Sequence, residues 1–169
     1  MNVLLMKHHL RSSKLLTVTE ISEPLWLKNS SWSTEKVDLR ENEILYSVLF
    51  PWTKRFEFVK EYKQAHRRED DIALVNAGIL VFLEVKDQKW ILSDACVVYG
   101  GVAPVSLLTL KTKEYLIGKP WSNETVQYAM EILKQDVVIS EDASGGMVEF
   151  RKSLILSFFF KFFFGYLTK

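Results

Sequence analysis

The segment of this chain with the most chemical potential is a dense run of charge between two apolar stretches. It reads Lys63-Gln64-Ala65-His66-Arg67-Arg68-Glu69-Asp70-Asp71, with three basic and three acidic groups. A solvated turn whose charges neutralise one another explains such a run. A polarised loop beside a bound ligand also explains it, because a unit charge acts far more strongly in a dry site than in water. The charge pattern alone leaves both interpretations open.

Other patterns of reactive residues are missing from the sequence. Neither Gly-x-Gly-x-x-Gly nor the phosphate-binding P-loop pattern occurs. His8, His9 and His66 do not have the spacing of metal ligands. The single cysteine, Cys96, forms no internal disulfide and cannot hold an iron–sulfur cluster, which takes four cysteines. We therefore expect no catalytic residue and no metal site, and a reduced, cytoplasmic setting.

The composition is that of an ordinary globular protein. Hydrophobic residues make up 48% and charged residues 25% of 169, which is enough for one domain with a sizeable core. The net charge of +1 gives no basic excess for nucleic-acid binding. The apolar stretch before Lys7 is too short for a secretory signal, so we expect no export.

The first half of the chain has the pattern of β-strands. Alternation and apolar runs bounded by turns predict four strands, at Ile44 to Phe50, Arg55 to Lys63, Leu74 to Val85 and Trp90 to Tyr99. Gly78 inside the third of them suggests a bulge.

The second half has a helical period. Ser106 is expected to cap a helix that runs to Ile117, with Gly118 at its end, and Ser122 to cap the next one. A last helix is expected from about Glu149. Strands followed by helices predict an α+β fold, an antiparallel sheet of about four strands with three helices packed on one side.

The phenylalanine-rich end, Leu154 to Leu167, could suggest a membrane segment. It is about 14 residues long and contains Lys161, whereas a membrane span needs about 20 apolar residues. Ser153, Ser157, Lys161 and Gly165 recur every four residues and form one stripe of a helix. We therefore expect a helix that is nearly enclosed by this chain or by a partner.

Five short motifs follow one another along the chain. They are Glu43-Ile44-Leu45, Tyr62 to Ala73, Tyr99-Gly100-Gly101-Val102-Ala103-Pro104, Gly145-Gly146-Met147-Val148-Glu149-Phe150-Arg151 and Leu156-Ser157-Phe158-Phe159-Phe160-Lys161-Phe162-Phe163. In identity, order and spacing, the stretch from Val37 to about Phe163 resembles the C-terminal part of the FAD-binding domain of xanthine dehydrogenases, especially those of plants. This is the CO dehydrogenase flavoprotein C-terminal domain family, and aldehyde oxidases share its architecture.

The resemblance implies a partial FAD site. Leu45 would be an apolar residue against the flavin, and Lys63 would be a lysine that contacts FAD. Arg67 and Asp70 would lie in the loop beside the flavin that governs access of NAD. Arg68 would anchor that loop. The glycine pairs at positions 100–101 and 145–146 are expected to form turns and not a phosphate cradle.

The resemblance also implies that much of the enzyme lies elsewhere. The full family enzyme uses molybdopterin, [2Fe–2S] clusters and NAD, none of which this chain is expected to bind. Residues 1–36 match nothing in the family and remain unassigned, and residues 37–169 form the family-like domain. The expected partner is the remainder of the FAD domain or the full-length enzyme. A non-catalytic interaction module, a module of an aldehyde oxidase and a membrane-anchored peptide are the alternatives.

Overall fold

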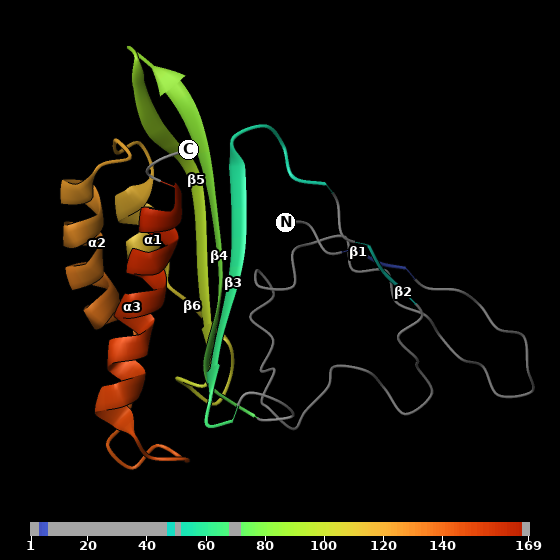
Figure 1. The fold of residues 1–169 in the computed structure, drawn as a ribbon, viewed down its shortest axis with the longest axis vertical. Helices are drawn as coiled ribbons and strands as arrows, with labels where there is room; N and C mark the ends of the chain where they lie inside the picture. Colours follow the sequence, from blue (N-terminus) through green and yellow to red (C-terminus); the bar gives the residue numbers. More distant parts are fainter. Residues whose placement is uncertain (1–3, 7–46, 50–51, 68–71, 167–169) are drawn as a thin grey trace, which may run out of the picture. The chain divides into compact units, whose positions relative to one another are not determined.

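A computed structural model of the chain describes residues 4–6, 47–49, 52–67 and 72–166 (Figure 1). The chain divides into two compact units, Met1–Thr53 and Lys54–Lys169. In the first unit, strands β1 (Leu4–Met6) and β2 (Ser47–Leu49) form an antiparallel pair. The predicted site residue Leu45 lies outside the described residues.

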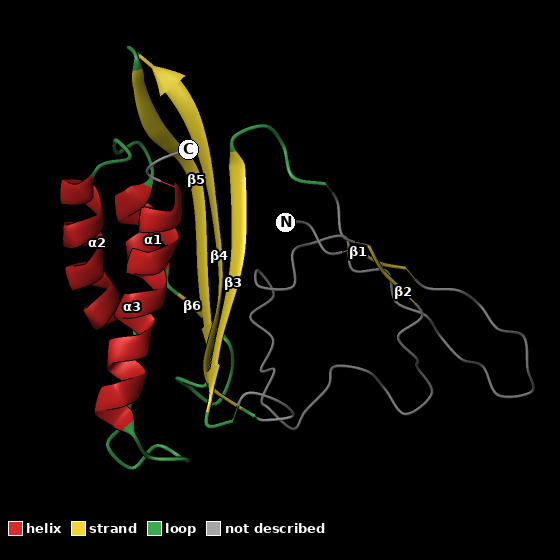
Figure 2. Ribbon diagram, viewed as in Figure 1, coloured by secondary structure: helices red, strands yellow, loops and turns green. Residues whose placement is uncertain are grey.

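The second unit combines one antiparallel sheet with a layer of helices. The sheet has the order β3 (Glu57–Ala65), β4 (Ala73–Lys86), β5 (Lys89–Gly100) and β6 (Leu107–Leu108). The helices are α1 (Leu110–Leu116), α2 (Asn123–Asp136) and α3 (Val148–Tyr166). Figure 2 shows all three on one side of the sheet. The predicted α+β fold, with a four-stranded antiparallel sheet and three helices, is therefore confirmed.

The fourth strand of this sheet is not the one that the sequence predicted. Within the expected strand at Ile44 to Phe50, the described residues form β2, which pairs with β1 in a separate sheet. The fourth strand is β6, which returns along β5 after the turn that begins at Gly101.

The start of α1 also differs from the prediction. Ser106 precedes β6, so it does not cap α1, which begins at Leu110. The carboxylate of Asp136, at the end of α2, accepts hydrogen bonds from the Thr112 backbone N–H and hydroxyl at 2.7 Å each. A cap supplied from another helix leaves no local signal in the sequence. Ser122, in contrast, caps α2 as predicted, with its side chain accepting from the Thr125 N–H.

Gly78 does not form the expected bulge. It pairs with Glu61 on β3 and with Val98 on β5 in an unbroken register. The pairing shifts elsewhere in β4 and β5, where Leu74 and Ser93 are the extra residues. The first of these bulges lies two residues from Asn76, close to the end of the sheet at which β3 finishes.

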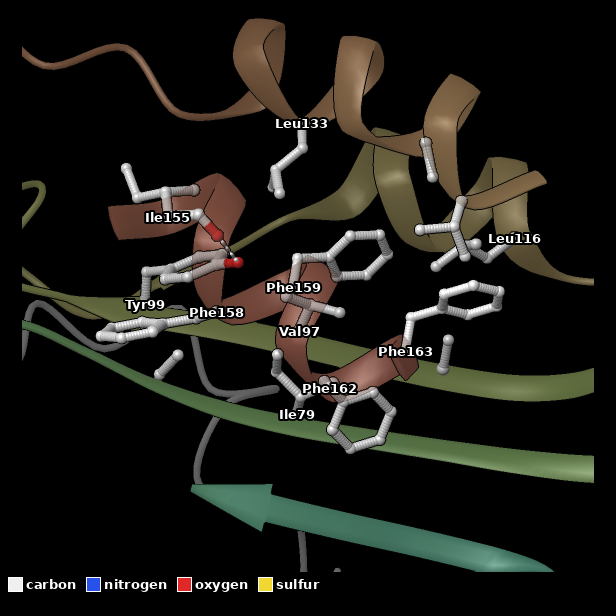
Figure 3. Packing of buried hydrophobic residues seen from close by; sticks show 14 of the residues in the cluster. Ile79, Val97, Tyr99, Leu116, Leu133, Ile155, Phe158, Phe159, Phe162 and Phe163 are labelled. Atoms are coloured by element: carbon white, nitrogen blue, oxygen red, sulfur yellow. Dashed lines mark hydrogen bonds between the residues drawn. The ribbon is translucent and has the colours of Figure 1, made fainter. Parts of the chain in front are cut away.

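The core lies between the helices and one face of the sheet. Helix α3 packs on β4 and β3, α1 packs on β5, and α2 packs on α1 and α3. Phe159, Phe162 and Phe163 of α3 are fully buried in the core between the helices and the sheet (Figure 3). The buried Tyr99 hydroxyl donates to the Ile155 carbonyl oxygen at 2.9 Å, and burial raises the pKa of Tyr99 well above its usual value.

The polar stripe on α3 is present as expected. Ser153, Ser157, Lys161 and Gly165 are all exposed. Enclosure of the other faces is less complete than expected, because Phe160 is 41% exposed and Phe164 is 60% exposed. Among the described helices, none is long and apolar enough to cross a membrane.

The contrast between buried and exposed phenylalanines on α3 gives a direct test of the fold. We expect Phe162→Ala to lower the free energy of unfolding by about 3–5 kcal/mol, since it empties a filled core position. Phe164→Ala is the matched control and is expected to change it by less than about 1 kcal/mol, because this side chain is largely in water. Urea denaturation of both variants measures the difference, and equal losses would contradict the packing described here.

Candidate functional site

The three helices pack on one face of the sheet (Figure 2). Successive side chains of a strand point to opposite faces. Ile79 and Val97 point into the core beneath the helices. Their neighbours therefore point to the other side, here called the second face. It comprises Val59, Glu61 and Lys63 of β3, Asn76, Gly78 and Leu80 of β4, and Cys96, Val98 and Gly100 of β5.

The pairing arranges the second face in three rows across the strands. The rows are Lys63–Asn76–Gly100, then Glu61–Gly78–Val98, then Val59–Leu80–Cys96. Directly opposed residues on paired strands lie within side-chain reach of each other. The face therefore changes from polar at the end nearest the charged loop to apolar further along the strands.

Lys63 supplies the positive charge at the polar end. Its side chain is exposed, and no described carboxylate pairs with it. Lys60 in the same strand, by contrast, pairs with Glu61 at 3.5 Å. An unpaired lysine beside an apolar surface is suited to binding an anionic or electron-rich ligand.

Of the other predicted site residues, Arg67 alone is described. It is exposed and follows the end of β3, so it lies at the same end of the sheet as Lys63. Arg68 and Asp70, like Leu45, lie outside the described residues. The roles of all five residues remain predictions.

The sequence predicts no particular role for Arg151. Its side chain nevertheless makes several hydrogen bonds to the loops around Gly101 and Gly146. The residue is buried, and its guanidinium group donates to the carbonyl oxygens of Gly146 at 2.6 Å, Ser144 at 2.8 Å and Gly101 at 3.0 Å. It therefore joins two of the five motifs. The arginine lay inside a recognised motif, but nothing in the sequence indicated that its partners would be backbone carbonyls.

The glycines around Arg151 have conformational reasons to be glycine. Gly101 has φ of 79°, and a Cβ there would lie 2.2 Å from the Leu74 carbonyl oxygen. Gly145 and Gly146 also have positive φ, at 82° and 57°. This left-handed conformation suits glycine in turns. The carbonyls of Gly101 and Gly146 accept from the arginine, and the Gly146 N–H donates to the Ala143 carbonyl oxygen at 3.0 Å.

Cys96, on the second face, is not an activated nucleophile. Burial raises the pKa of its thiol to about 11, and the lowering effect of Lys113 does not offset this. The thiol therefore stays protonated at neutral pH. Within the described part of the chain, no group of three His, Cys, Asp or Glu side chains could hold a metal ion.

Fold and site together define an α+β domain whose second sheet face carries Lys63 and Asn76 at one end and the row Val59–Leu80–Cys96 further along. Residues 60–165 match the CO dehydrogenase flavoprotein C-terminal domain. Since this match covers more than half of the 169 residues, the chain belongs to that family.

Its relatives are much longer proteins. Xanthine dehydrogenase 1 of Arabidopsis thaliana is 63% identical over 128 residues, which are 76% of this chain and 9% of that protein. The human aldehyde oxidase is 38% identical over 126 residues, 75% of this chain and 9% of that protein. The chain thus spans about a tenth of the length of the curated relatives it matches.

Solved structures share the fold at low sequence identity. The quinoline 2-oxidoreductase of Pseudomonas putida 86 is 20% identical with a TM-score of 0.66, over 96% of this chain and 51% of that one. The carbon monoxide dehydrogenase of Hydrogenophaga pseudoflava is 19% identical with a TM-score of 0.62, over 76% of this chain and 43% of that one.

Proposed function

We propose that this chain forms part of the FAD-binding module of a molybdenum hydroxylase of the xanthine dehydrogenase type. In such an enzyme, electrons from a purine pass from a molybdenum cofactor through two [2Fe–2S] clusters to FAD, which reduces NAD in the cytoplasm. One observation carries the proposal: Lys63, which pairs with no carboxylate of the described residues, stands at the polar end of the second face in a domain of a flavoprotein family. Identities of 59–63% to three plant xanthine dehydrogenases, against 38% to aldehyde oxidases, favour the xanthine dehydrogenase type.

The described residues fit a flavin. The isoalloxazine ring system is flat and needs apolar walls together with a few placed polar groups. Val98 and the buried Leu80 are apolar residues of the second face, Glu61 lies in the row of Val98, and Lys63 lies two rows from Leu80. Bound FAD supplies the acceptance and release of electrons. A fixed ammonium group beside it stabilises added negative charge and so favours reduction.

The remaining predicted residues complete this proposal. Leu45 would contribute an apolar contact to the flavin. Arg67 and Asp70 would set the sign of the local field where NAD approaches, since opposite charges in one short loop let a small movement change that field. Arg68 would hold the loop through charge-assisted or stacking contacts.

Lys63 can be tested against a second lysine of the same strand. In a complete enzyme carrying these residues, made by placing them in the Arabidopsis thaliana xanthine dehydrogenase 1, we expect Lys63→Met to lower the flavin midpoint potential. Loss of a neighbouring cation disfavours the reduced, more negative flavin. Lys60→Met is the control, because alternation directs that side chain to the other face of the sheet. Equal potentials in both variants and the parent would refute the contact.

The chain by itself is proposed to be incomplete and inactive. Most contacts to FAD, including those to its pyrophosphate, would come from parts of the enzyme beyond this chain, so most of the binding energy is missing. We therefore expect little or no flavin to stay with the purified chain after FAD is added and the sample is desalted. Absorbance near ~450 nm, in the flavin band, measures this. A stoichiometric yellow complex would show that the site is complete.

The charged loop is open to a kinetic test in the same complete enzyme. We expect Asp70→Ala to change the rate with NAD more than the rate with an artificial dye that accepts electrons at the molybdenum end. The reason is that the field of this loop acts where NAD meets the flavin and not at the purine site. Equal losses in the two assays would mean that the loop is only structural.

A non-catalytic interaction module is the second candidate function. The exposed rings of Phe160 and Phe164, whose centroids are 5.6 Å apart, favour it because adjacent exposed aromatic side chains are frequent at protein interfaces. The chain would then bind the full-length enzyme, as a free polypeptide, without contributing to electron transfer. Co-purification of the tagged chain with a full-length relative, abolished by Phe160→Ser together with Phe164→Ser, would establish this alternative.

A further inference from the structure

Gly78 occupies a position where the fold of this unit does not require glycine. It lies in the interior of β4, which has β3 on one side and β5 on the other. It is not among the residues with positive φ, and a Cβ placed on it would meet no atom of the described residues within 4 Å. Glycine in a strand interior destabilises a protein by about 0.5–1 kcal/mol relative to alanine. Glycine at position 78 therefore weakens the sheet, and the backbone conformation there does not require it.

Gly100 and Gly101, in contrast, lie where a Cβ would collide with neighbouring atoms. A Cβ on Gly100 would lie 2.1 Å from Oδ1 of Asn76, and a Cβ on Gly101 would lie 2.2 Å from a backbone carbonyl oxygen. Glycine inside a strand otherwise marks a bulge, a bend, or a place where a ligand or another backbone approaches closely. The unbroken pairing of Gly78 with Glu61 and Val98 excludes a bulge. A bend, or the close approach of another backbone or of a ligand, remains.

The surroundings of Gly78 indicate what kind of molecule approaches. In the row on one side, Asn76 is exposed and its side-chain amide lies over Gly100. That amide has no hydrogen-bond partner among the described residues. In the row on the other side, Leu80 is apolar. Gly78 leaves a strip of bare backbone between the side chains of Glu61 and Val98. The Asn76 amide lies along one border of this strip and the buried Leu80 along the other, which suits the polar edge of a flat heteroaromatic ring.

We infer that the flavin ring lies over Gly78 and that Asn76 is a second polar residue, besides Lys63, that positions it. This inference rests on the proposed function, since Lys63 is the neighbour of Asn76 that brings the flavin to this face. The missing side chain at Gly78 allows the ring to approach the backbone. The Asn76 amide, which can donate and accept, contacts the polar edge of the ring.

The full 169-residue chain can test this inference with flavin mononucleotide as a weak probe. Chemical shifts of the ¹⁵N-labelled chain are followed while the probe is raised into the millimolar range. We expect the largest changes at Gly78, Gly100 and the Asn76 side-chain amide. Gly78→Val should raise the dissociation constant roughly 10-fold by blocking the strip, and Asn76→Leu roughly 3-fold by removing one hydrogen bond.

The controls separate loss of binding from loss of fold. Asn123→Leu replaces an exposed asparagine of the helical layer and should leave the probe affinity unchanged. Gly78→Ala has room for its methyl group, so its melting temperature should not fall. If Gly78→Val does not fold, Gly78→Ala takes its place, with a smaller loss of affinity.

Two results would overturn the inference in distinguishable ways. If shifts appear at Lys63 but not at Gly78 or Asn76, or if Gly78→Val binds as tightly as the parent, the inference is wrong while the flavin contact of Lys63 stands. If the probe shifts none of these residues, the inference is also wrong. The proposed function is then decided by the potential of the Lys63→Met enzyme, which does not depend on this experiment.

Discussion

The structure of the second unit depends on the burial of one face of β4 and β5. Residues at alternate positions of these strands, such as Ile79, Val97 and Tyr99, are almost completely buried beneath the helices. Removing this much apolar surface from water is the main favourable term available to a unit of this size. Because the alternation has a period of two, burying one face fixes which residues lie on the other. The arrangement of Lys63, Asn76 and Gly78 on the second face is thus a consequence of the core.

Arg151 determines how the loops at one end of this sheet are arranged. Its guanidinium group is buried without a described carboxylate partner, and carbonyl oxygens of two separate loops satisfy its N–H groups. A buried charge that lost these bonds would be strongly destabilising, so the loops are held to it. Gly101 directly follows Gly100, the last residue of β5. Gly100 pairs with Asn76, and Asn76 pairs with Lys63. The same contacts that hold Gly101 therefore limit movement at the polar end of the second face.

Local patterns in the sequence predicted much of this fold. Apolar periodicity located β3, β4 and β5, and Ser122 and Gly118 marked the ends of helices because caps and left-handed turns are chemical features of single residues. The start of α1 could not be found in this way, since the carboxylate that caps it belongs to Asp136, more than twenty positions away. The partner of β2 could not be found either. Three-residue strands carry too little periodicity to reveal their pairing.

For the candidate site, too, the sequence identifies individual residues but not their neighbours on adjacent strands. Resemblance to a family predicts a flavin contact for Lys63, whereas the charge pattern around it by itself favours a solvated turn. Pairing between strands adds the position of Lys63, which lies beside Asn76 and one row from Gly78. Its contact with a flavin stays a prediction. The glycines make the point most clearly. In the sequence, Gly78 and Gly101 are alike, whereas in the structure a backbone carbonyl accounts for Gly101 and no atom of the described fold accounts for Gly78. A residue that lowers stability without a reason in the described fold is the observation behind the proposed approach of a flavin to Gly78.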